Sequence, residues 1–394
     1  MSRALSISRL FSHLFSLLTV ALAFASVAHA DLTMTFGGDI NFNKNKQVPL
    51  ADGVQVGGRV VGFSETMSGI KGLIDGDLNF ANIETVVTDE KLLPAQAKTF
   101  VFRSHPNAIR QLFDIGFNLF SLANNHSYNH GFGGLGETLD AMDVFRSEGR
   151  RFTAAGIERT REGFQTAKTL HINGHTVAFA AIGITDDSFR ATSSKTGVLS
   201  YRNEADYELV LKSLREATAD LKILSVHSGI EMKTSTEVDQ RARLERALKE
   251  GDVDLVLGHH PHVVRPVALV DGRAIFYSLG NYLMLGAADI SGRGLGMDYG
   301  LFARAHFGWD ASARRLRLQA VEAIPLTNMQ IQPKPLSARA AADRIAYLNK
   351  LSLADLGAKN ALEFKIRADG SGVACIERGS QDVPFSVRAH AVCP

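Results

Sequence analysis

The chain has 394 residues, of which 45% are hydrophobic and 21% are charged. These fractions are typical of a globular protein. The formal net charge is only +2, and no stretch is rich in lysine and arginine, so we expect no nucleic-acid partner. The length accommodates one large α/β domain with a short appendage, or two domains of ordinary size.

The first thirty residues have the pattern of an export signal. Arg3 and Arg9 precede an apolar run that ends in the small residues "AHA", Ala28 to Ala30. This pattern predicts a cleaved signal peptide over residues 1–30 and a periplasmic or extracellular protein. The run is also about long enough to stay in a bilayer as an anchor, and we expect membrane contact only in that case.

Short apolar runs of β type alternate with polar clusters and helical patterns from residue 32 onward. Strands are expected at 32–36, 78–82, 117–123, 221–226, 253–258 and 274–280, and helices at 105–116, 133–149, 204–219 and 237–251. Asn173-Gly174 predicts the turn of a hairpin, because this pair adopts the positive φ angles that a tight turn needs. The alternation predicts an α/β fold, in which ligands bind at the carboxyl ends of the strands.

The pattern changes after residue 330. Prolines lead into an amphipathic helix near 332–353, and residues 362–377 are typical of a hairpin. We therefore expect a main domain over 31–330 and a small helix-plus-hairpin appendage over 331–394. Cys375 and Cys393, the only cysteines, are a candidate disulfide in an exported chain, with two free thiols as the alternative.

Potential metal ligands follow the expected strands. They are Asp39, Glu84, Asn125 with His126, His227, His260 and His262. Each residue taken alone is more commonly structural: an aspartate or asparagine makes turns, and a lone histidine is usually hydrogen-bonded in the core. Carboxylate and imidazole together suit Mn, Fe or Zn, and a shared carboxylate with several terminal ligands suits a site for two ions. The recurrence of these residues at strand ends favours the metal site.

The motifs "GGDINF", "ANIETVVT", "SLANNHSYNHG", "SVHSGIE", "GHHPH" and "YSLGN" resemble the ordered set of the CapA family, the poly-γ-glutamate capsule-biosynthesis proteins. That family is similar to calcineurin-like metallophosphoesterases, and the resemblance covers about residues 31–283. It implies a four-layer α/β/β/α sandwich with two divalent cations at the sheet edges. The resemblance also implies roles: Asp39 and Glu84 as carboxylate ligands with Glu84 in the bridging place, Asn125, His227, His260 and His262 as further ligands, and His126 as general acid or transition-state stabiliser.

This sequence departs from ordinary phosphoesterases in two places. The Asp-x-His motif becomes Asp39-Ile40-Asn41, which puts the occupancy of one metal position in doubt. His259 adds a third histidine to the last motif, so which of the three neighbours bind metal stays open. Residues that could support the ligands are Asn41, Asn82, Asn124, His130 and His259.

Three hypotheses for function remain. The first is an exported metal-dependent hydrolase that acts on a phosphate ester or on an anionic polymer of the capsule or cell envelope, with two cations activating water. The second keeps the metal centre but hydrolyses amide bonds of poly-γ-glutamate or peptidoglycan. The third is a non-catalytic accessory protein that binds the polymer or other capsule-synthesis proteins.

Overall fold

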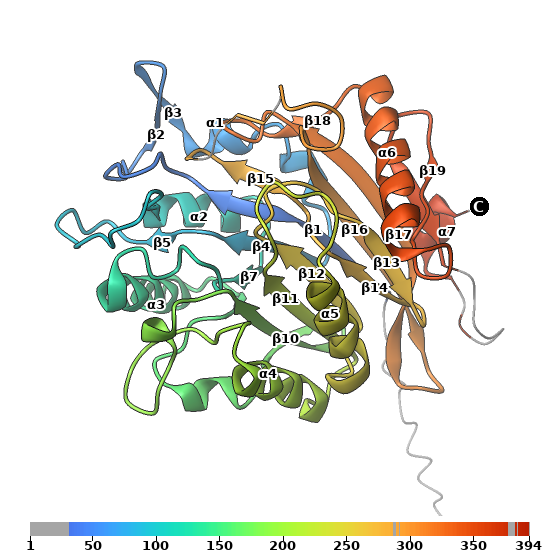
Figure 1. Cartoon of the computed structure of the whole chain (residues 1–394), viewed down its shortest axis with the longest axis horizontal. Helices are drawn as coiled ribbons and strands as arrows, with labels where there is room; N and C mark the ends of the chain where they lie inside the picture. Colours follow the sequence, from blue (N-terminus) through green and yellow to red (C-terminus); the bar gives the residue numbers. More distant parts are fainter. Residues whose placement is uncertain (1–30, 287–288, 291, 377–382, 384, 394) are drawn as a thin grey trace, which may run out of the picture.

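The computed structural model describes residues 31–286, 289–290, 292–376, 383 and 385–393 (Figure 1). The signal peptide predicted for residues 1–30 lies outside this range. Within the described ranges, none of the helices combines the length and apolarity needed to cross a membrane.

A ten-stranded sheet forms one half of the molecule. Its main order is β19 (Lys365–Ile366), β20 (Gly372–Cys375), β17 (Arg315–Thr327), β16 (Gly300–Asp310), β1 (Leu32–Asn41), β4 (Leu78–Ile83), β7 (Leu119–Ser121) and β8 (Thr153–Ala155). β15 (Asn281–Met284) pairs with β1, and β18 (Lys334–Pro335) pairs with β17. β1, β4, β7 and β8 are parallel to one another, so their carboxyl ends lie at one edge of the sheet.

A six-stranded sheet forms the other half. Its order is β13 (Val267–Val270), β14 (Arg273–Phe276), β12 (Leu255–His259), β11 (Leu221–His227), β10 (His175–Gly183) and β9 (Lys168–Ile172). The predicted hairpin is confirmed: β9 and β10 pair antiparallel around Asn173 and Gly174, whose φ angles are 52° and 81°. β10, β11, β12 and β14 are parallel.

The two sheets pack face to face, with helices on both outer faces. Between the sheets, Phe36 packs edge-on against Phe276 at 4.9 Å, and this inner core also holds Phe80 and Phe179. α1 (Phe63–Met67), α2 (Pro106–Asp114) and α3 (Gly131–Ser147) cover the first sheet, and α4 (Glu204–Glu216) and α5 (Val238–Glu250) cover the second. Figure 1 shows α4 and α5 beside β10, β11 and β12. The predicted four-layer α/β/β/α sandwich is confirmed, because both faces of each sheet are buried.

Short elements complete the layers. They are the hairpin of β2 (Gly53–Val56) and β3 (Arg59–Gly62), the paired β5 (Val86–Val87) and β6 (Arg103–Ser104), and the 3₁₀ turns η1 (Lys71–Leu73), η2 (Arg161–Phe164) and η3 (Asp187–Phe189).

The helix and the hairpin expected after residue 330 are built into the main fold. α6 (Ala338–Leu356) contributes Ile345 and Leu348 to the core between the sheets. The hairpin of β19 and β20 extends the first sheet, because β20 pairs antiparallel with β17. Cys375 of β20 and Cys393, next to α7 (Val387–Val392), are joined by a disulfide with a Cα–Cα distance of 5.8 Å.

The carboxyl ends of the parallel strands in the two sheets meet at one edge of the sandwich. In the first sheet Asp39 is in register with Asn82 and with Asn281, and in the second His227 is in register with His259. Gly38 permits this approach, since a Cβ at that position would lie 1.7 Å from the carbonyl oxygen of Gly280. A larger residue could not be accommodated without moving the backbone.

Candidate metal centre

Two buried carboxylates lie at the edge of the sandwich where the carboxyl ends of the parallel strands meet. Asp39 lies in β1 and Glu84 follows β4 directly, and both are 0% exposed. Neither oxygen of Glu84 receives a hydrogen bond from any described residue. Burial raises the pKa of the Glu84 carboxyl well above its usual range, and the neighbouring charge of Asp39 raises it further. A buried carboxylate without a donor is costly, and a bound cation would remove that cost.

Asp39 has partners that hold it in the anionic form. Asn82 Nδ2 donates to its Oδ1 at 2.7 Å, and the backbone N–H of His260 donates to Oδ2 at 3.3 Å. Burial by itself would raise the pKa of Asp39, but the contact of its Oδ1 with His259 Nδ1 at 3.4 Å and the other imidazoles around it bring the pKa below its ordinary value. The anionic form of Asp39 is therefore favoured, and this is the form in which a carboxylate binds a cation.

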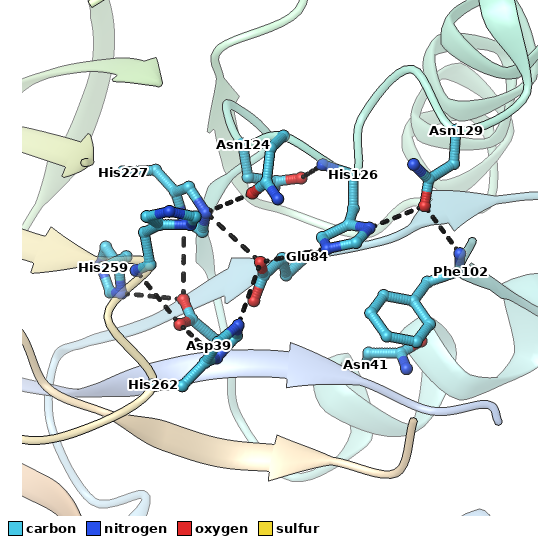
Figure 2. A network of polar contacts seen from close by, with 12 residues as sticks. Asp39, Asn41, Glu84, Phe102, Asn124, His126, Asn129, His227, His259 and His262 are labelled. Carbon is cyan, nitrogen blue, oxygen red and sulfur yellow. Dashed lines mark hydrogen bonds and ion pairs between the residues drawn. The ribbon is translucent and has the colours of Figure 1, made fainter. Parts of the chain in front are cut away.

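The side chains combine into two candidate ligand groups that share one carboxylate. Glu84, His227 and His260 form one group, and Asp39, Glu84 and His262 form the other, with the ligand atoms of each group within 4.8 Å of one another. His227 Nε2 lies 3.3 Å from Glu84 Oε1, and His262 Nε2 lies 3.9 Å from the same oxygen (Figure 2). Glu84 is thus the carboxylate that the two candidate ligand groups share, which is the place of a bridging ligand in a site for two cations.

Asn125 contributes an amide oxygen to the first group. Its Oδ1 lies 2.7 Å from His227 Nε2, which itself faces Glu84. On the other side of the ring, Asn82 Nδ2 lies 3.2 Å from His227 Nδ1. Asn82 therefore contacts a ligand of each group, because it also holds Asp39, and it orients both.

The His-Pro-His loop has a strained backbone. His260 and His262 have φ angles of 97° and 56°, a region that non-glycine residues rarely adopt. Such conformations cost roughly 1–3 kcal/mol each and occur preferentially at functional sites. Asn281 Oδ1 lies 2.7 Å from His262 Nδ1, which leaves Nε2 directed toward Glu84. Asn281 thus orients this candidate ligand.

Burial keeps two of these imidazoles neutral, which is the form that binds a metal. It lowers the pKa of His260 to about 3 and holds the pKa of His227 well below its usual value. His259 behaves differently from its neighbours: its ring stacks on Phe80 at 5.5 Å, and its Nδ1 lies 3.4 Å from Asp39 Oδ1. Of the three adjacent histidines, His260 and His262 belong to the ligand groups, and His259 supports Asp39.

His126 lies beside the candidate ligands, and its contact with Asn129 shows which ring nitrogen carries the proton. The backbone N–H of Phe102 can only donate, and it bonds to Asn129 Oδ1 at 2.7 Å, so this amide oxygen faces His126 as well. His126 Nδ1, at 2.8 Å from the same oxygen, must then carry the proton. The Phe102 ring lies 4.5 Å from the imidazole and keeps it in place. His126 Nε2 faces Glu84 Oε1 at 3.8 Å.

This geometry refines the role predicted for His126. Burial lowers the pKa of His126 to about 3, so the ring is neutral and its Nε2 has a free lone pair. Donation from Nε2 therefore requires a second proton on the ring. An anionic substrate would favour that proton, since a nearby negative charge raises the pKa of an imidazole.

The other predicted supporting residues lie outside the two ligand groups. Asn41 folds onto its own strand end: its amide donates to the carbonyl of Asn43 at 2.6 Å, and its oxygen accepts from Ser104. Asn124 stabilises the loop that carries Asn125 and His126. Its side chain accepts a hydrogen bond from the backbone N–H of His126 and donates one to the carbonyl of Ile83. His130 Nδ1 bonds to the carbonyls of Leu93 and Pro94 at 3.0 and 3.1 Å.

The sequence reasoning assigned no role to Asn129, Asn281 or Lys98. Asn129 orients His126, Asn281 orients His262, and Lys98 Nζ donates to the backbone oxygen of Asn125 at 2.9 Å. Asn129 and Asn281 stand inside motifs that were noticed, "SYNHG" and "YSLGN", but nothing in the spacing says which ring each amide would meet. Lys98 belongs to a polar loop without any motif.

Replacing Asn129 by leucine should lower kcat while leaving the metal content unchanged, because His126 loses the acceptor that orients it. We expect a loss of about 10-fold to 100-fold, the usual effect of removing a group that orients a functional side chain. Steady-state kinetics and metal analysis of the variant would test this. Asn129→Asp keeps the acceptor and should restore most of kcat. A loss of bound metal in Asn129→Leu would contradict the positioning role.

The fold and the cluster together define a two-sheet α/β protein with a candidate dinuclear metal centre. Carboxylate, imidazole and amide ligands fit divalent Mn, Fe or Zn. The unpartnered oxygens of Glu84 and the unpartnered Nδ1 of His260 are consistent with this use within the described part of the chain.

The chain belongs to the family of bacterial capsule synthesis proteins described as PGA_cap, whose model matches residues 33–285. The matched segment contains every candidate ligand from Asp39 to His262. The family resemblance inferred from the motifs is thereby confirmed.

Two individual relatives share 30% or less of their residues with this chain over about half of its length. The PGA biosynthesis protein CapA of Bacillus subtilis (strain 168) is 30% identical over 207 residues, which cover 51% of this chain and 52% of the relative. A probable polyglutamine synthesis accessory protein of Mycobacterium tuberculosis (strain CDC 1551 / Oshkosh) is 26% identical over 217 residues, or 52% of this chain and 55% of the relative. The chain thus spans about half the length of these curated relatives. Among solved structures, the calcineurin-like phosphoesterase YfkN from Bacillus subtilis aligns with a TM-score of 0.42 and 13% identity, over 82% of this chain and 98% of that chain.

Proposed function

We propose that this protein is an exported metal-dependent hydrolase that cleaves a phosphate ester in the synthesis of a capsule or envelope polymer. The observation that carries the proposal is Glu84, a fully buried carboxylate shared by both ligand groups, whose two oxygens have no donor among the described residues. Membership of the capsule synthesis family supports the link to a polymer.

Different residues of the chain would bind the cations and transfer the proton. One cation would be held by Glu84, Asn125, His227 and His260, and the other by Asp39, Glu84 and His262. Bound divalent cations supply Lewis acidity, which stabilises negative charge on a phosphoryl oxygen and lowers the pKa of water. His126 keeps its first proton on Nδ1 against Asn129, takes up a second on Nε2 as the anionic substrate binds, and delivers it to the leaving oxygen.

Metal analysis of the purified mature protein, combined with a screen of phosphomonoesters and phosphodiesters, tests the proposal. We expect bound divalent metal, turnover that a chelator abolishes, and recovery on adding back Mn²⁺, Fe²⁺ or Zn²⁺. Absence of bound metal after reconstitution would overturn the proposal. Metal-dependent cleavage of poly-γ-glutamate without ester cleavage would replace it by an amide hydrolase.

A second candidate function is an accessory protein in polymer synthesis. The Mycobacterium tuberculosis relative, a probable accessory protein of polyglutamine synthesis, favours it. In that case the protein would bind metal and polymer but turn over neither ester nor amide. The same screen therefore separates the two candidates, since only the hydrolase releases product.

A further inference from the structure

His260 takes its place in the first ligand group with a strained backbone. Its φ angle of 97° lies farther from the left-handed minimum, near 57°, than the 56° of His262. Its own backbone hydrogen bond, to Asp39 Oδ2, is long at 3.3 Å. Strained conformations persist only where the surrounding structure imposes them. The restraint on His260 therefore comes mainly from the segments that pack against its loop.

The segment between β11 and α5, residues 228–237, lies along the His-Pro-His loop. The backbone N–H of Ser228 donates to the carbonyl of His259 at 3.0 Å, and the backbone N–H of Met232 donates to the carbonyl of Pro261 at 2.9 Å. These two bonds reach the residues immediately before and after His260. The position of segment 228–237 therefore fixes the backbone on both sides of this candidate ligand.

Arg265 holds this segment in position. The residue is 0% exposed and lies three residues after His262. Its guanidinium donates to the carbonyls of Ile230 and Lys233, both at 2.9 Å, to the two carboxylate oxygens of Glu237, at 2.6 and 3.1 Å, and to Gln240 Oε1, at 2.7 Å. Gln240 Nε2 in turn donates to the carbonyl of Ser228 at 3.0 Å. One side chain thus joins the His-Pro-His loop to both ends of segment 228–237.

The backbone of the segment passes close to the guanidinium at Gly229. The φ angle of Gly229 is 117°, and a Cβ at this position would lie 2.8 Å from Arg265 Nη1. Only glycine fits such a conformation at this distance without strain. The planar fork of arginine offers five donors in a fixed geometry, which lysine does not. The contact is therefore specific to arginine on one side and to glycine on the other.

We propose that Arg265 is a positioning residue of the metal centre. By holding residues 228–237 against the His-Pro-His loop, it keeps His260 in the strained conformation that places the ring near Glu84 and His227. A guanidinium has no lone pair for a cation, so Arg265 acts only through the ligand. The inference deepens the proposed function and rests on it, since it concerns the same candidate metal centre.

Calorimetric titration of the metal-free mature protein with Mn²⁺ tests the proposal. Arg265→Met should weaken Mn²⁺ binding about 10-fold to 100-fold, the usual effect of removing a residue that orients a metal ligand. Arg265→Lys keeps the charge but not the fork, so it should recover only part of the affinity. Glu237→Gln leaves Arg265 in place and should cause a smaller loss in the same direction, which guards against a folding defect in the arginine variants.

Arg315→Met is the matched control. Arg315 also pairs with two carboxylates, Asp252 at 2.6 Å and Asp254 at 3.0 Å, but these precede β12, at the end of that strand opposite to His259. This variant should lower Tm as Arg265→Met does and leave Mn²⁺ affinity unchanged. Hydrogen exchange in chelator adds a readout without metal: the amide of Met232 should exchange faster in Arg265→Met and at the parent rate in Arg315→Met.

A double-mutant cycle with His260→Ala shows whether Arg265 acts through His260. In the His260→Ala background, Arg265→Met should cause little further loss of Mn²⁺ affinity, whereas independent effects would add. Additive losses would overturn the positioning role. Unchanged affinity in both Arg265→Met and Glu237→Gln, or equal losses in Arg265→Met and Arg315→Met, would also overturn it.

The proposed hydrolase is judged by a separate measurement. A parent protein that cleaves no ester, with Mn²⁺ affinity that depends on Arg265 as expected, would refute the hydrolase and leave the positioning role standing. Chelator-sensitive ester cleavage by the parent, with Mn²⁺ affinity that is the same in the Arg265 variants, would do the reverse.

Discussion

Glu84→Gln should remove bound metal from the protein and lower turnover on the order of 1,000-fold or more. The carboxylate belongs to both ligand groups, so its loss weakens both cation positions at once. Glutamine has the same shape but no charge, which separates the electrostatic role from packing. Metal analysis after reconstitution, together with steady-state kinetics on the best ester substrate, measures both effects.

The same substitution should have the opposite effect on the stability of the metal-free protein. Glu84 is fully buried without a donor from the described residues, so replacing the acid by a neutral amide removes a penalty of about 1–3 kcal/mol. Thermal unfolding in chelator should therefore show a higher Tm for the variant, whereas the parent should gain more stability from added metal.

Glu322→Gln is the matched control for this prediction. Glu322 is also buried, but it accepts from His306 Nε2 at 2.9 Å and from Arg367 at 2.5 Å. Its replacement should lower Tm and leave the metal content unchanged. Full metal content in Glu84→Gln, or a fall in its metal-free Tm comparable to that of the control, would contradict the bridging role.

Asn125→Ala and His126→Ala should separate metal binding from proton transfer at adjacent positions. Asn125 Oδ1 joins the group of His227 and Glu84, so its removal should reduce metal content and, through it, turnover. His126 belongs to neither ligand group, so His126→Ala should retain the metal and lower kcat by about 100-fold to 10,000-fold, the usual range for loss of a proton-transfer group.

His171→Ala, at an exposed position of β9, is the control for removing a histidine and should match the parent in both measurements. The proton-transfer role predicts a further difference. An ester with a very acidic leaving group needs no protonation, so His126→Ala should lose least activity on that substrate. Equal losses on good and poor leaving groups, or a loss of metal, would show that His126 is a ligand or a structural residue.

Much of the fold could be read from local patterns. The apolar runs at 32–36, 78–82 and 221–226 form β1, β4 and β11, and the helical patterns at 204–219 and 237–251 form α4 and α5. These predictions succeed because periodicity reports which faces an element buries. The helix and hairpin after residue 330 were also recognisable. Their place in the first sheet was not, since the pairing of β20 with β17 depends on distant partners that no local pattern names.

For the candidate site, the sequence likewise predicts which residues meet but not how their side chains are oriented. Parallel strands place their carboxyl ends at one edge, so the residues that follow them, such as Asp39, Glu84 and His227, could be expected to meet. The orientation of each ring could not, because it depends on hydrogen bonds from residues far away in the chain. Asn281 directs His262 toward Glu84, and the stacking of His259 on Phe80 turns that ring toward Asp39.

By itself the sequence determined the kinds of candidate ligand and their positions at strand ends, because both follow from residue type and local pattern. Only the tertiary structure decided that Glu84 is shared, that His126 carries its proton on Nδ1, and that Arg265 joins the His-Pro-His loop to the segment after β11. Each of these properties is a relation between side chains from separate elements, and such relations exist only once the two sheets have packed together.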